Sequence, residues 1–305
     1  MHGLLNVNKP PGPTSHDVVA RVRRISGATR VGHAGTLDPP ACGVLLVCLG
    51  CATRIIEYLV DWRKSYRVAA VFGVETDTED ASGKITREGD ASPVTAHLIE
   101  STVEGFVGRI SQIPPMVSAV HHEGRRLYEL ARAGKTVERE ARQVEVYAIR
   151  LVDFAPGERP VAVLDVECSK GTYIRTLCAD IGAALGCGAH VSALERTSVG
   201  CFRVEDALSL DAIEELSAAG RIEESVHSID DVLADMPIAY LSEDQAIKVV
   251  HGVEIPADEV SALPVTGSVV RIHDPTGRLL GMGIVRLRDN IPMLKPEKMF
   301  GGSNT

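Results

Sequence analysis

The sequence predicts an α+β fold, with a mixed, largely antiparallel sheet and a small C-terminal β-rich module. Strand patterns at residues 144–152 and 161–168 follow each other at hairpin spacing, and no strand–helix–strand period repeats along the chain. After an acidic helical stretch, short strand patterns return near residues 240–300. We therefore predict one domain of residues 1–236 and a module of residues 237–305.

The composition is that of a globular protein large enough for one sizeable domain and a smaller one. Hydrophobic residues make up 45% of the 305 residues and charged residues 24%, which is ordinary for this class. Neither a basic and apolar leader nor a long apolar window occurs, so we expect a cytoplasmic protein without a membrane segment. A monomer with no obligate protein partner is the default expectation.

The formal net charge of −9 is unevenly distributed. Residues 201–260 hold fifteen acidic residues against three basic ones, so this stretch carries −12 and the rest of the chain +3. Within it, residues 205–235 are predicted to form an acidic helical connector. A mildly basic body is compatible with a local basic groove that binds nucleic acid.

Seven cysteines, several of them inside apolar runs, indicate buried and reduced thiols in a cytosolic protein. Cys48 and Cys51 have the spacing of a redox or metal pair, but no second pair lies at zinc-ligand spacing, so we interpret them as packing residues. The acidic loop of residues 75–83 does not place its acids and glycine where a calcium loop needs them. We expect no metal.

The N-terminal elements follow from apolar spacing and its interruptions. Residues 3–7 form a short apolar strand pattern that ends at the proline-rich hinge of residues 9–13. Ser15 is the predicted N-cap of a helix with one apolar face, and Gly27 ends that helix. Arginines at positions 21, 23 and 24 lie off this face, where they meet either solvent or an RNA backbone.

The segment Gly32-His33-Ala34-Gly35-Thr36-Leu37-Asp38-Pro39 is the most informative one. It places a carboxylate on a glycine-containing loop that a proline closes, and the apolar run of residues 43–49 follows. An acid held in a fixed direction at the mouth of a buried strand suits a nucleophile or a general base. The alternative is a tight turn in which Asp38 only accepts backbone hydrogen bonds.

Further along, residues 66–74 alternate apolar and polar side chains as a half-buried strand does. The strand pattern of residues 161–168 leads to Gly171-Thr172-Tyr173-Ile174-Arg175 and then to a helix that ends at Gly186. The predicted elements of the module are a capped helix that starts within residues 241–246 and strands at residues 268–272 and 279–285.

Four separated segments occur in an order typical of one protein family. They are Asn8-Lys9-Pro10-Pro11-Gly12, the segment from Gly32 to Pro39, Lys64-Ser65-Tyr66-Arg67 with Thr76-Asp77-Thr78, and Ser169-Lys170-Gly171-Thr172-Tyr173-Ile174-Arg175. Shorter matches lie at residues 113–116, 126–134, 188–191 and 294–298. Together they resemble the TruB family of tRNA pseudouridine synthases, in its bacterial stand-alone form, over essentially the whole chain.

The resemblance implies the pseudouridine-synthase fold for residues 1–236 and a PUA-like RNA-binding module for residues 237–305. It also implies that uridine 55 in the T arm of tRNA is isomerised to pseudouridine. In that reaction the base flips out, its glycosidic bond to N1 breaks, and C5 is joined to C1′. No redox change or hydrolysis takes place, so no cofactor is expected. Assistance of tRNA folding is a further expectation.

Asp38 matches the essential aspartate of the family. It attacks the base, attacks the sugar or removes a sugar proton, and all three routes need an ionised acid shielded from water. Because burial alone disfavours the charged form of a carboxyl group, a cation is expected beside it. Arg175 matches the family's active-site arginine and is the predicted partner, with a surface ion pair as the alternative. Lys9 and Pro10 fit structural support of the catalytic loop.

Four further residues match positions around the reacting base. Tyr66 matches the tyrosine that stacks on the flipped uracil, although a strand tyrosine is more often a core residue. Tyr173 and Leu194 match positions that line the base pocket. His33 matches a histidine that takes part in base flipping.

Pro40, Cys42, Val117 and His121 depart from the family pattern. They concern packing or RNA contact and leave the reactive positions unchanged. Three competing hypotheses are an RNA-binding or tRNA-folding protein, the catalytic subunit of a guide-RNA particle, and a glycosidase. The complete set of reactive positions argues against the first and the short C-terminal module against the second. The third needs paired carboxylates that the sequence does not indicate.

Overall fold

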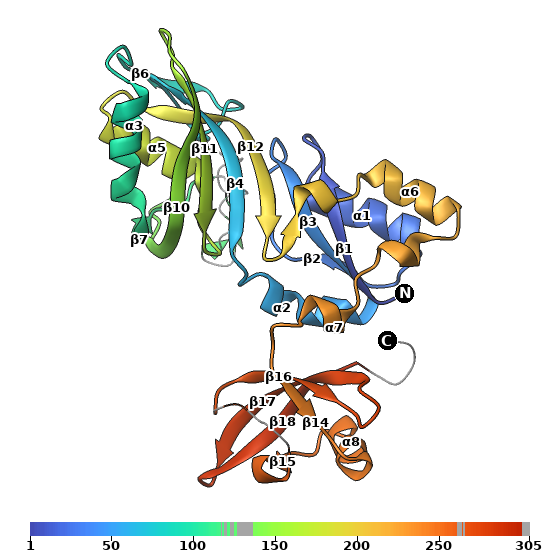
Figure 1. The fold of residues 1–305 in the computed structure, drawn as a ribbon. Helices are drawn as coiled ribbons and strands as arrows, with labels where there is room; N and C mark the ends of the chain where they lie inside the picture. Colours follow the sequence, from blue (N-terminus) through green and yellow to red (C-terminus); the bar gives the residue numbers. More distant parts are fainter. Residues whose placement is uncertain are drawn as a thin grey trace.

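A computed structural model gives the structure of the chain and describes residues 1–116, 118, 121–122, 125–126, 137–260, 264 and 266–300. Two sheets organise these residues, a nine-stranded sheet in the first two thirds of the chain and a five-stranded sheet near its C-terminus (Figure 1). The predicted α+β class and the C-terminal β-rich module are confirmed.

The large sheet has the path β1-β3-β12-β4-β11-β10-β7, with β2 paired to β3 and β13 paired to β12. Its strands are β1 (Gly3–Lys9), β2 (Val31–His33), β3 (Cys42–Leu49), β4 (Lys64–Phe72), β7 (Gly108–Gln112), β10 (Arg142–Ala155), β11 (Val161–Cys168), β12 (Ala189–Val199) and β13 (Phe202–Arg203). Every pair is antiparallel except β12 with β3, which confirms the mixed, largely antiparallel sheet.

Two small hairpins and the helices complete the domain. The hairpins are β5 (Val74–Thr76) with β6 (Ile85–Glu88), and β8 (His121–His122) with β9 (Arg125–Arg126). The described α-helices outside the module are α1 (Ser15–Ser26), α2 (Ile56–Leu59), α3 (Ala96–Val103), α5 (Ile174–Ala184), α6 (Leu210–Ala218) and α7 (Ile229–Val232). No helix of the described residues is long and apolar enough to cross a membrane.

The five-stranded sheet has the order β14-β16-β17-β18-β15. Its strands are β14 (Ile238–Tyr240), β15 (Ile255–Pro256), β16 (Val269–His273), β17 (Leu279–Arg288) and β18 (Ile291–Met299), and α8 (Glu243–Val250) packs beside them. The capped helix of the module is confirmed, because Ser242 and Gln245 form a reciprocal capping box at the start of α8. We keep the division after residue 236 as a proposal.

The start of α1 differs from the prediction. Thr14, and not Ser15, caps the helix: its side chain accepts from the Asp17 amide, and the Asp17 carboxylate accepts from the Thr14 amide. Ser15 is the first helical residue, and its hydroxyl is used by another segment. The predicted end is confirmed, since Gly27 closes the helix with φ 65°.

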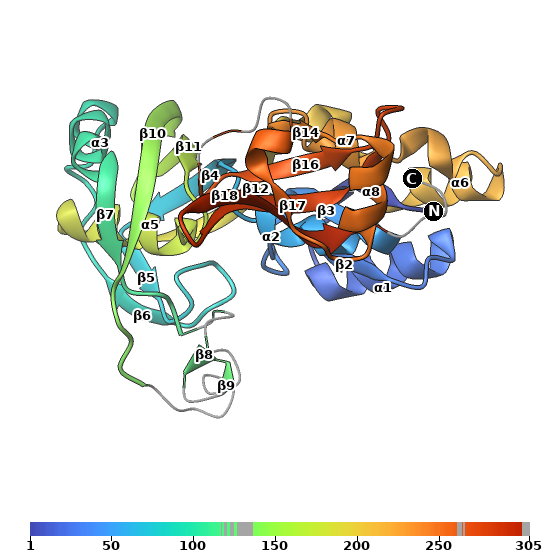
Figure 2. The ribbon, with the colours of Figure 1, turned by 90° about the horizontal axis from the view of Figure 1, so that it is seen from below.

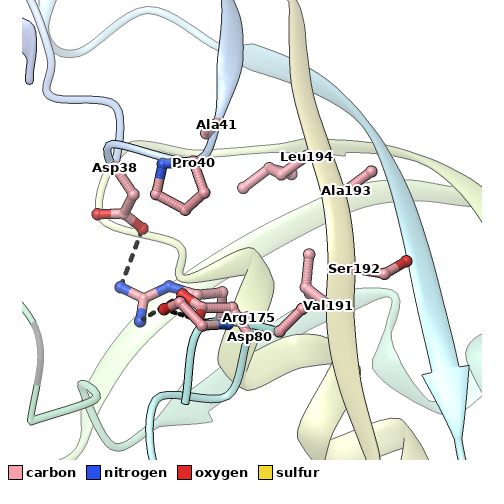
Figure 3. Close-up of a pocket in the computed structure, with 11 residues that line it drawn as sticks. Asp38, Pro40, Ala41, Asp80, Arg175, Val191, Ser192, Ala193 and Leu194 are labelled. Atoms are coloured by element: carbon pink, nitrogen blue, oxygen red, sulfur yellow. Dashed lines mark hydrogen bonds and ion pairs between the residues drawn. The ribbon is translucent and has the colours of Figure 1, made fainter. Parts of the chain in front are cut away.

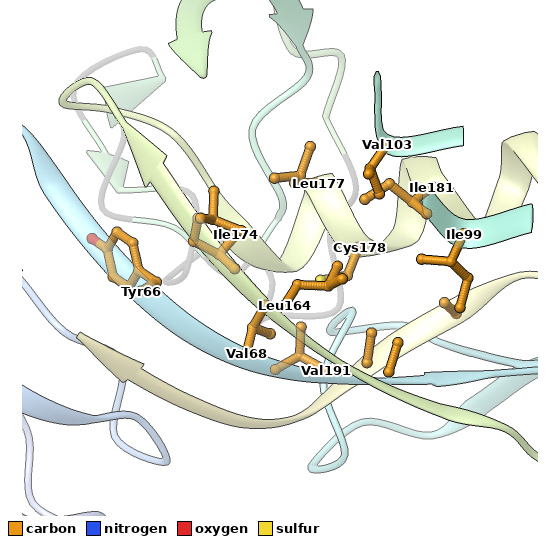
Figure 4. Close-up of a cluster of buried hydrophobic side chains, with 14 of the residues drawn as sticks. Tyr66, Val68, Ile99, Val103, Leu164, Ile174, Leu177, Cys178, Ile181 and Val191 are labelled. Atoms are coloured by element: carbon orange, nitrogen blue, oxygen red, sulfur yellow. The ribbon is translucent and has the colours of Figure 1, made fainter. Parts of the chain in front are cut away.

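Helices pack against the large sheet and bury its apolar residues. On one face α3 and α5 pack against β4 and β11, and Figure 4 shows this cluster, with Tyr66 at one end of it. The predicted alternation in β4 is confirmed because Tyr66, Val68, Ala70 and Phe72 are buried in turn. At the other end of the sheet α1 and α6 cover β1 and β3.

The acidic stretch of residues 205–235 folds back onto the large sheet. The Asn6 carbonyl accepts from Leu208, and α6 buries Leu210 and Ile213 against α1. Its acids face outward, where Arg21 lies 2.6 Å from Asp211. This stretch therefore belongs to the packing of the large domain.

The module packs against the large domain through a shared apolar cluster. Val232 of α7 and Leu46 of β3 belong to it, and so do Leu279 and Met282 of β17. Figure 1 shows α2 and α7 between the two sheets, and in Figure 2, seen from below, the module lies in front of the large domain. Lys298 of β18 also reaches α2. The module is therefore anchored to the domain that carries the candidate site.

Candidate active site

Asp38 lies on the loop between β2 and β3. Gly35 turns this loop with φ 111°, a conformation that other residues rarely adopt. The Asp38 carbonyl accepts from the Ala41 amide at 3.1 Å, which closes a turn behind the carboxylate. The Asp38 side chain is 38% exposed, so it is open to a ligand on one side.

Lys9 at the end of β1 holds the exit of this loop. Its fully buried ammonium donates to the Pro39 carbonyl at 3.1 Å, the Ala41 carbonyl at 2.7 Å and the Pro10 carbonyl at 3.0 Å. Burial is the main reason that the pKa of Lys9 is lowered to about 8. Pro10 itself is exposed. The proline-rich hinge and the Asp38 loop are thus tied together through backbone carbonyls.

Ser15 holds the middle of the loop from α1. Its hydroxyl donates to the Leu37 carbonyl at 3.0 Å and accepts from the Leu37 amide at 2.9 Å. Ser15 and Leu37 are both buried, so these two hydrogen bonds satisfy polar atoms that water does not reach. Sequence reasoning had assigned this hydroxyl to the helix cap and missed its contact with the loop.

Arg175 in the first turn of α5 lies beside the carboxylate (Figure 3). Its Nη2 is 2.9 Å from Asp38 Oδ2, and its side chain is only 4% exposed. Nη1 donates to the Thr78 carbonyl at 2.7 Å and lies 3.8 Å from Asp80 Oδ2. A buried guanidinium held from behind in this way fixes the direction of the ion pair.

Asp80 is a site residue that sequence reasoning missed. Its carboxylate accepts from the Thr78 hydroxyl at 2.7 Å and from the Ser82 amide at 2.9 Å. The loop around it is fastened to β12, because Ala81 donates to the Val191 carbonyl at 2.9 Å. Sequence reasoning used this loop only to reject a calcium site and, through Thr76-Asp77-Thr78, for the family resemblance. The signal in the sequence was the position of Asp80 between Thr78 and Ser82, because both side chains donate to its carboxylate.

Asp38, Asp80, Arg175 and Leu194 line one pocket, together with Pro40, Ala41, Ala81, Ser82, Val191, Ser192 and Ala193. Figure 3 shows the β12 residues forming one wall and the Asp38 loop another. The pocket encloses about 360 Å³ of empty space, part of it open to solvent. The pocket therefore gives a ligand access to the Asp38 carboxylate from the solvent side.

His33, Tyr66 and Tyr173 do not line this pocket. Tyr66 is buried at the end of the apolar cluster, and burial raises the pKa of its phenol. Tyr173 precedes α5, where the Gln112 side chain bonds its backbone amide and carbonyl. His33 ends β2, half-buried and edge-to-face with His16, and burial lowers the pKa of its imidazole.

Arg196 on β12 is a second residue that sequence reasoning missed. It is fully buried and donates to backbone carbonyls of the segment that carries Asp38. From the sequence alone, an arginine in the middle of a strand is expected at the surface. The backbone carbonyls that Arg196 binds are distant in the sequence and give no local signal. Arg196 lies beneath the Asp38 loop because β12 pairs with β3 and β4.

Two of the four departing positions lie at the pocket. Pro40 lines it, and Cys42 donates through Sγ to the Leu194 carbonyl at 3.7 Å. Val117 lies outside the described residues, and His121 is described only by its backbone in β8.

All seven cysteines are free thiols, four of them buried. Among the described residues, no group of three or more His, Cys, Asp or Glu side chains could hold a metal ion.

Comparison with known proteins identifies the class of protein as a pseudouridine synthase. Residues 23–174 match the model of the TruB family pseudouridylate synthase N-terminal domain. Residues 175–239 match that of the tRNA pseudouridylate synthase B C-terminal domain. The chain therefore belongs to the TruB family of pseudouridine synthases, and it is an isomerase.

The chain is similar to curated and solved proteins over most of its length. It is 50% identical to the tRNA pseudouridine synthase B of Symbiobacterium thermophilum over 82% of each chain. It is 43% identical to that of Moorella thermoacetica over 98% of this chain and 99% of the relative. A chain in a structure of an H/ACA RNP bound to a substrate RNA containing 2′-deoxyuridine has a TM-score of 0.74 and 26% identity, with 98% of this chain and 85% of that one covered.

Proposed function

We propose that this enzyme isomerises uridine 55 in the T arm of tRNA to pseudouridine, without a cofactor. The observation that carries the proposal is the 2.9 Å ion pair between Asp38 and Arg175, which both line one pocket. The name of the curated relatives, tRNA pseudouridine synthase B, supports tRNA as the substrate.

The reaction breaks the bond from N1 to C1′ and forms the bond from C5 to C1′, while C5 loses a proton and N1 gains one. Asp38 supplies the ionised carboxylate that each of the three possible routes requires. Arg175 favours that charged form and fixes its direction. The Thr78 carbonyl and Asp80 keep the guanidinium in place behind it.

The flipped base enters between β12 and the Asp38 loop. Leu194 and Val191 give the pocket an apolar wall, and burial of the base there excludes water from the reacting atoms. In this proposal Tyr66 and Tyr173, which lie outside the pocket lining, contact the base after it has entered. His33 occupies the other end of the loop, where it takes part in flipping.

The C-terminal module contributes RNA binding in this proposal. It is anchored on α2 and α7, beneath the sheet that carries the site, so one RNA could touch both units (Figure 1). Recognition of a T arm by its shape and backbone agrees with the way proteins read structured RNA. The module also supports a role in tRNA folding that accompanies the catalysis.

The guide-RNA particle is the second candidate, because the solved H/ACA RNP chain shares the fold. Sequence identity separates the two: it is 26% to the RNP chain and 43–50% to the tRNA enzymes. We therefore favour the stand-alone enzyme, which reads its RNA directly.

The substrate is tested with purified protein and an unmodified T-arm stem-loop RNA, without any guide RNA. We expect pseudouridine at the position equivalent to 55 and nowhere else, and no product from the same RNA with cytidine at that position. Binding of the RNA without pseudouridine formation contradicts the proposal. Product that appears only after a guide RNA is added favours the second candidate.

A further inference from the structure

Arg196 is the largest fully buried side chain of the described residues, and the reaction outlined above does not use it. No carboxylate of the described residues lies within 4.0 Å of its nitrogens, so no ion pair offsets its burial there. A buried charge without an ionic partner is costly and needs hydrogen bonds instead. We therefore expect Arg196 to have a role that an apolar residue at this position could not fill.

The guanidinium donates in three directions to backbone carbonyls. Nε donates to the Val44 carbonyl at 2.7 Å, Nη2 to the Gly35 carbonyl at 3.1 Å and Nη1 to the Thr36 carbonyl at 3.3 Å. Gly35 and Thr36 precede Asp38 by three and two residues. Arg196 therefore holds the entry of the catalytic loop, whereas Lys9 holds its exit.

The same residue lies directly opposite Tyr66 across the β12–β4 pair. Paired residues of neighbouring strands place their side chains on the same face of a sheet. The positive charge of the Arg196 guanidinium opposes the rise in the pKa of Tyr66 that burial causes. One residue thus binds the Asp38 loop and lies opposite the tyrosine.

We propose that Arg196 is a positioning residue that sets the Asp38 loop and the Tyr66 phenol in one geometry, and this rests on the proposed roles of Asp38 and Tyr66. Only a planar fork with several donors reaches three carbonyls from a position directly opposite Tyr66. A misplacement of about 1 Å at a reacting group costs on the order of 100-fold in rate. Arg196 therefore acts on the chemical step through two other residues.

The test uses Arg196→Lys and Arg196→Met, with Ile213→Ala as a control. Ile213 is fully buried between α6 and α1, so its truncation lowers stability away from the site. Single-turnover rates with saturating enzyme, RNA affinity and urea unfolding are measured for each. We expect RNA affinity within threefold of wild type for both Arg196 variants, a loss of rate of about 100-fold in Arg196→Met, and a smaller loss in Arg196→Lys. The control keeps its rate.

A double-mutant cycle with Tyr66→Phe separates positioning from a purely structural role. If Arg196 acts partly through the phenol, the rate lost on Arg196→Met is at least tenfold smaller in the Tyr66→Phe background. Rate losses that simply multiply contradict the coupling. Removal of an unrelated structural support gives no such dependence on Tyr66.

The outcomes distinguish this inference from the proposed function. A full rate in Asp38→Asn overturns the proposed role of Asp38. An inactive Asp38→Asn together with an Arg196→Lys rate within twofold of wild type overturns the positioning role of Arg196 alone. If Arg196→Met does not fold, Arg196→Lys carries the test. An Arg196→Lys protein that is unfolded where Ile213→Ala is folded also contradicts the proposal, because Arg196 then serves the fold.

Discussion

At the scale of the residue, the candidate site is a carboxylate with one cation in front of it and a second carboxylate behind that cation. Arg175 lies between Asp38 and Asp80, and its side chain is almost fully buried. Asp80 is itself held by hydroxyl and amide donors of its loop. The direction of Asp38 is therefore set by Arg175 and, through it, by Asp80 and its loop.

Asp80→Asn keeps the shape of the side chain and removes its charge. The hydrogen bonds that hold the Thr78 loop weaken, and Arg175 loses an anion that fixes it. Since a hydrogen bond to a charged group contributes about 1.5–3 kcal/mol, we expect a single-turnover rate lower by about 10- to 100-fold with RNA affinity unchanged. Asp77→Asn, in the same loop but exposed, is the matched control. Equal losses in both variants contradict the role of Asp80.

The pH dependence of stability tests whether the charge of Lys64 is buried. Its ammonium donates to the Val60 and Trp62 carbonyls, and burial lowers its pKa from 10.5 to about 8. Because the folded state releases the proton first, the cost of burial is full below pH 8 and is relieved between pH 8 and 10.5.

The free energy of unfolding of wild type, relative to Lys64→Met, should therefore rise across this window. The slope should be at most about 1.4 kcal/mol per pH unit. Urea unfolding of both proteins from about pH 7 to 10 measures it, and thiols and tyrosines common to both proteins largely cancel. A difference that stays flat or falls as the pH rises is the contrary result.

At the scale of the element, β12 joins the two halves of the large sheet. It pairs antiparallel with β4 on one side and parallel with β3 on the other. Gly43 makes the parallel contact possible, because a Cβ there would lie 2.3 Å from the Arg196 carbonyl. The strand that carries Leu194 and Arg196 therefore also fixes the start of β3 next to the Asp38 loop.

Gly43→Ala should lower the free energy of unfolding by more than Gly27→Ala does. Both glycines have positive φ, 99° and 65°, and a Cβ at Gly27 meets nothing within 4 Å. We expect about 1 kcal/mol for the backbone conformation alone at Gly27, and a further 1–3 kcal/mol for the clash at Gly43. Equal costs in urea unfolding would show that β3 does not approach β12 this closely.

Sequence reasoning succeeded where the signal was local. The alternation in β4, the end of α1 at Gly27 and the capped start of α8 all depend on neighbours within a few residues. It failed at Ser15, because a threonine and an aspartate beside it form a better cap. The parallel pairing of residues 42–43 with 195–196 has no local signal at all.

The site was predictable only in part for the same reason. The glycine and proline around Asp38 indicated a fixed acid, but the choice of Arg175 as its partner came from the family resemblance. Asp80 and Arg196 are buried by strands and loops distant in the sequence. The partners of Arg196 are backbone carbonyls, which leave no pattern of residue types.

At the scale of the whole molecule, the module and the large domain share one apolar cluster and several polar contacts. Arg271 of β16 donates to the Met236 and Ala234 carbonyls and lies 2.7 Å from Asp230. Lys298 lies 2.5 Å from Glu57 of α2. In the proposed function, this junction sets the distance between the base pocket and the surface that binds the rest of the RNA.

Met282→Ala should loosen this junction. Met282 is fully buried in the shared cluster, so the truncation costs about 2–5 kcal/mol of stability. We expect the Kd for T-arm RNA to rise by about tenfold, or 1.4 kcal/mol, while the single-turnover rate at saturating enzyme stays within threefold. Ile213→Ala, which destabilises α6 instead, should leave the Kd unchanged. An unchanged Kd in Met282→Ala would show that the junction does not matter for binding.

The most direct measurement is the rate of pseudouridine formation by Asp38→Asn on an unmodified T-arm RNA, with RNA affinity measured beside it. The amide has nearly the same size as the carboxylate but carries no charge to attack a nucleotide or accept a proton. We predict RNA binding close to that of wild type and no detectable pseudouridine. Product formation by Asp38→Asn at the wild-type rate would contradict the central role of this residue.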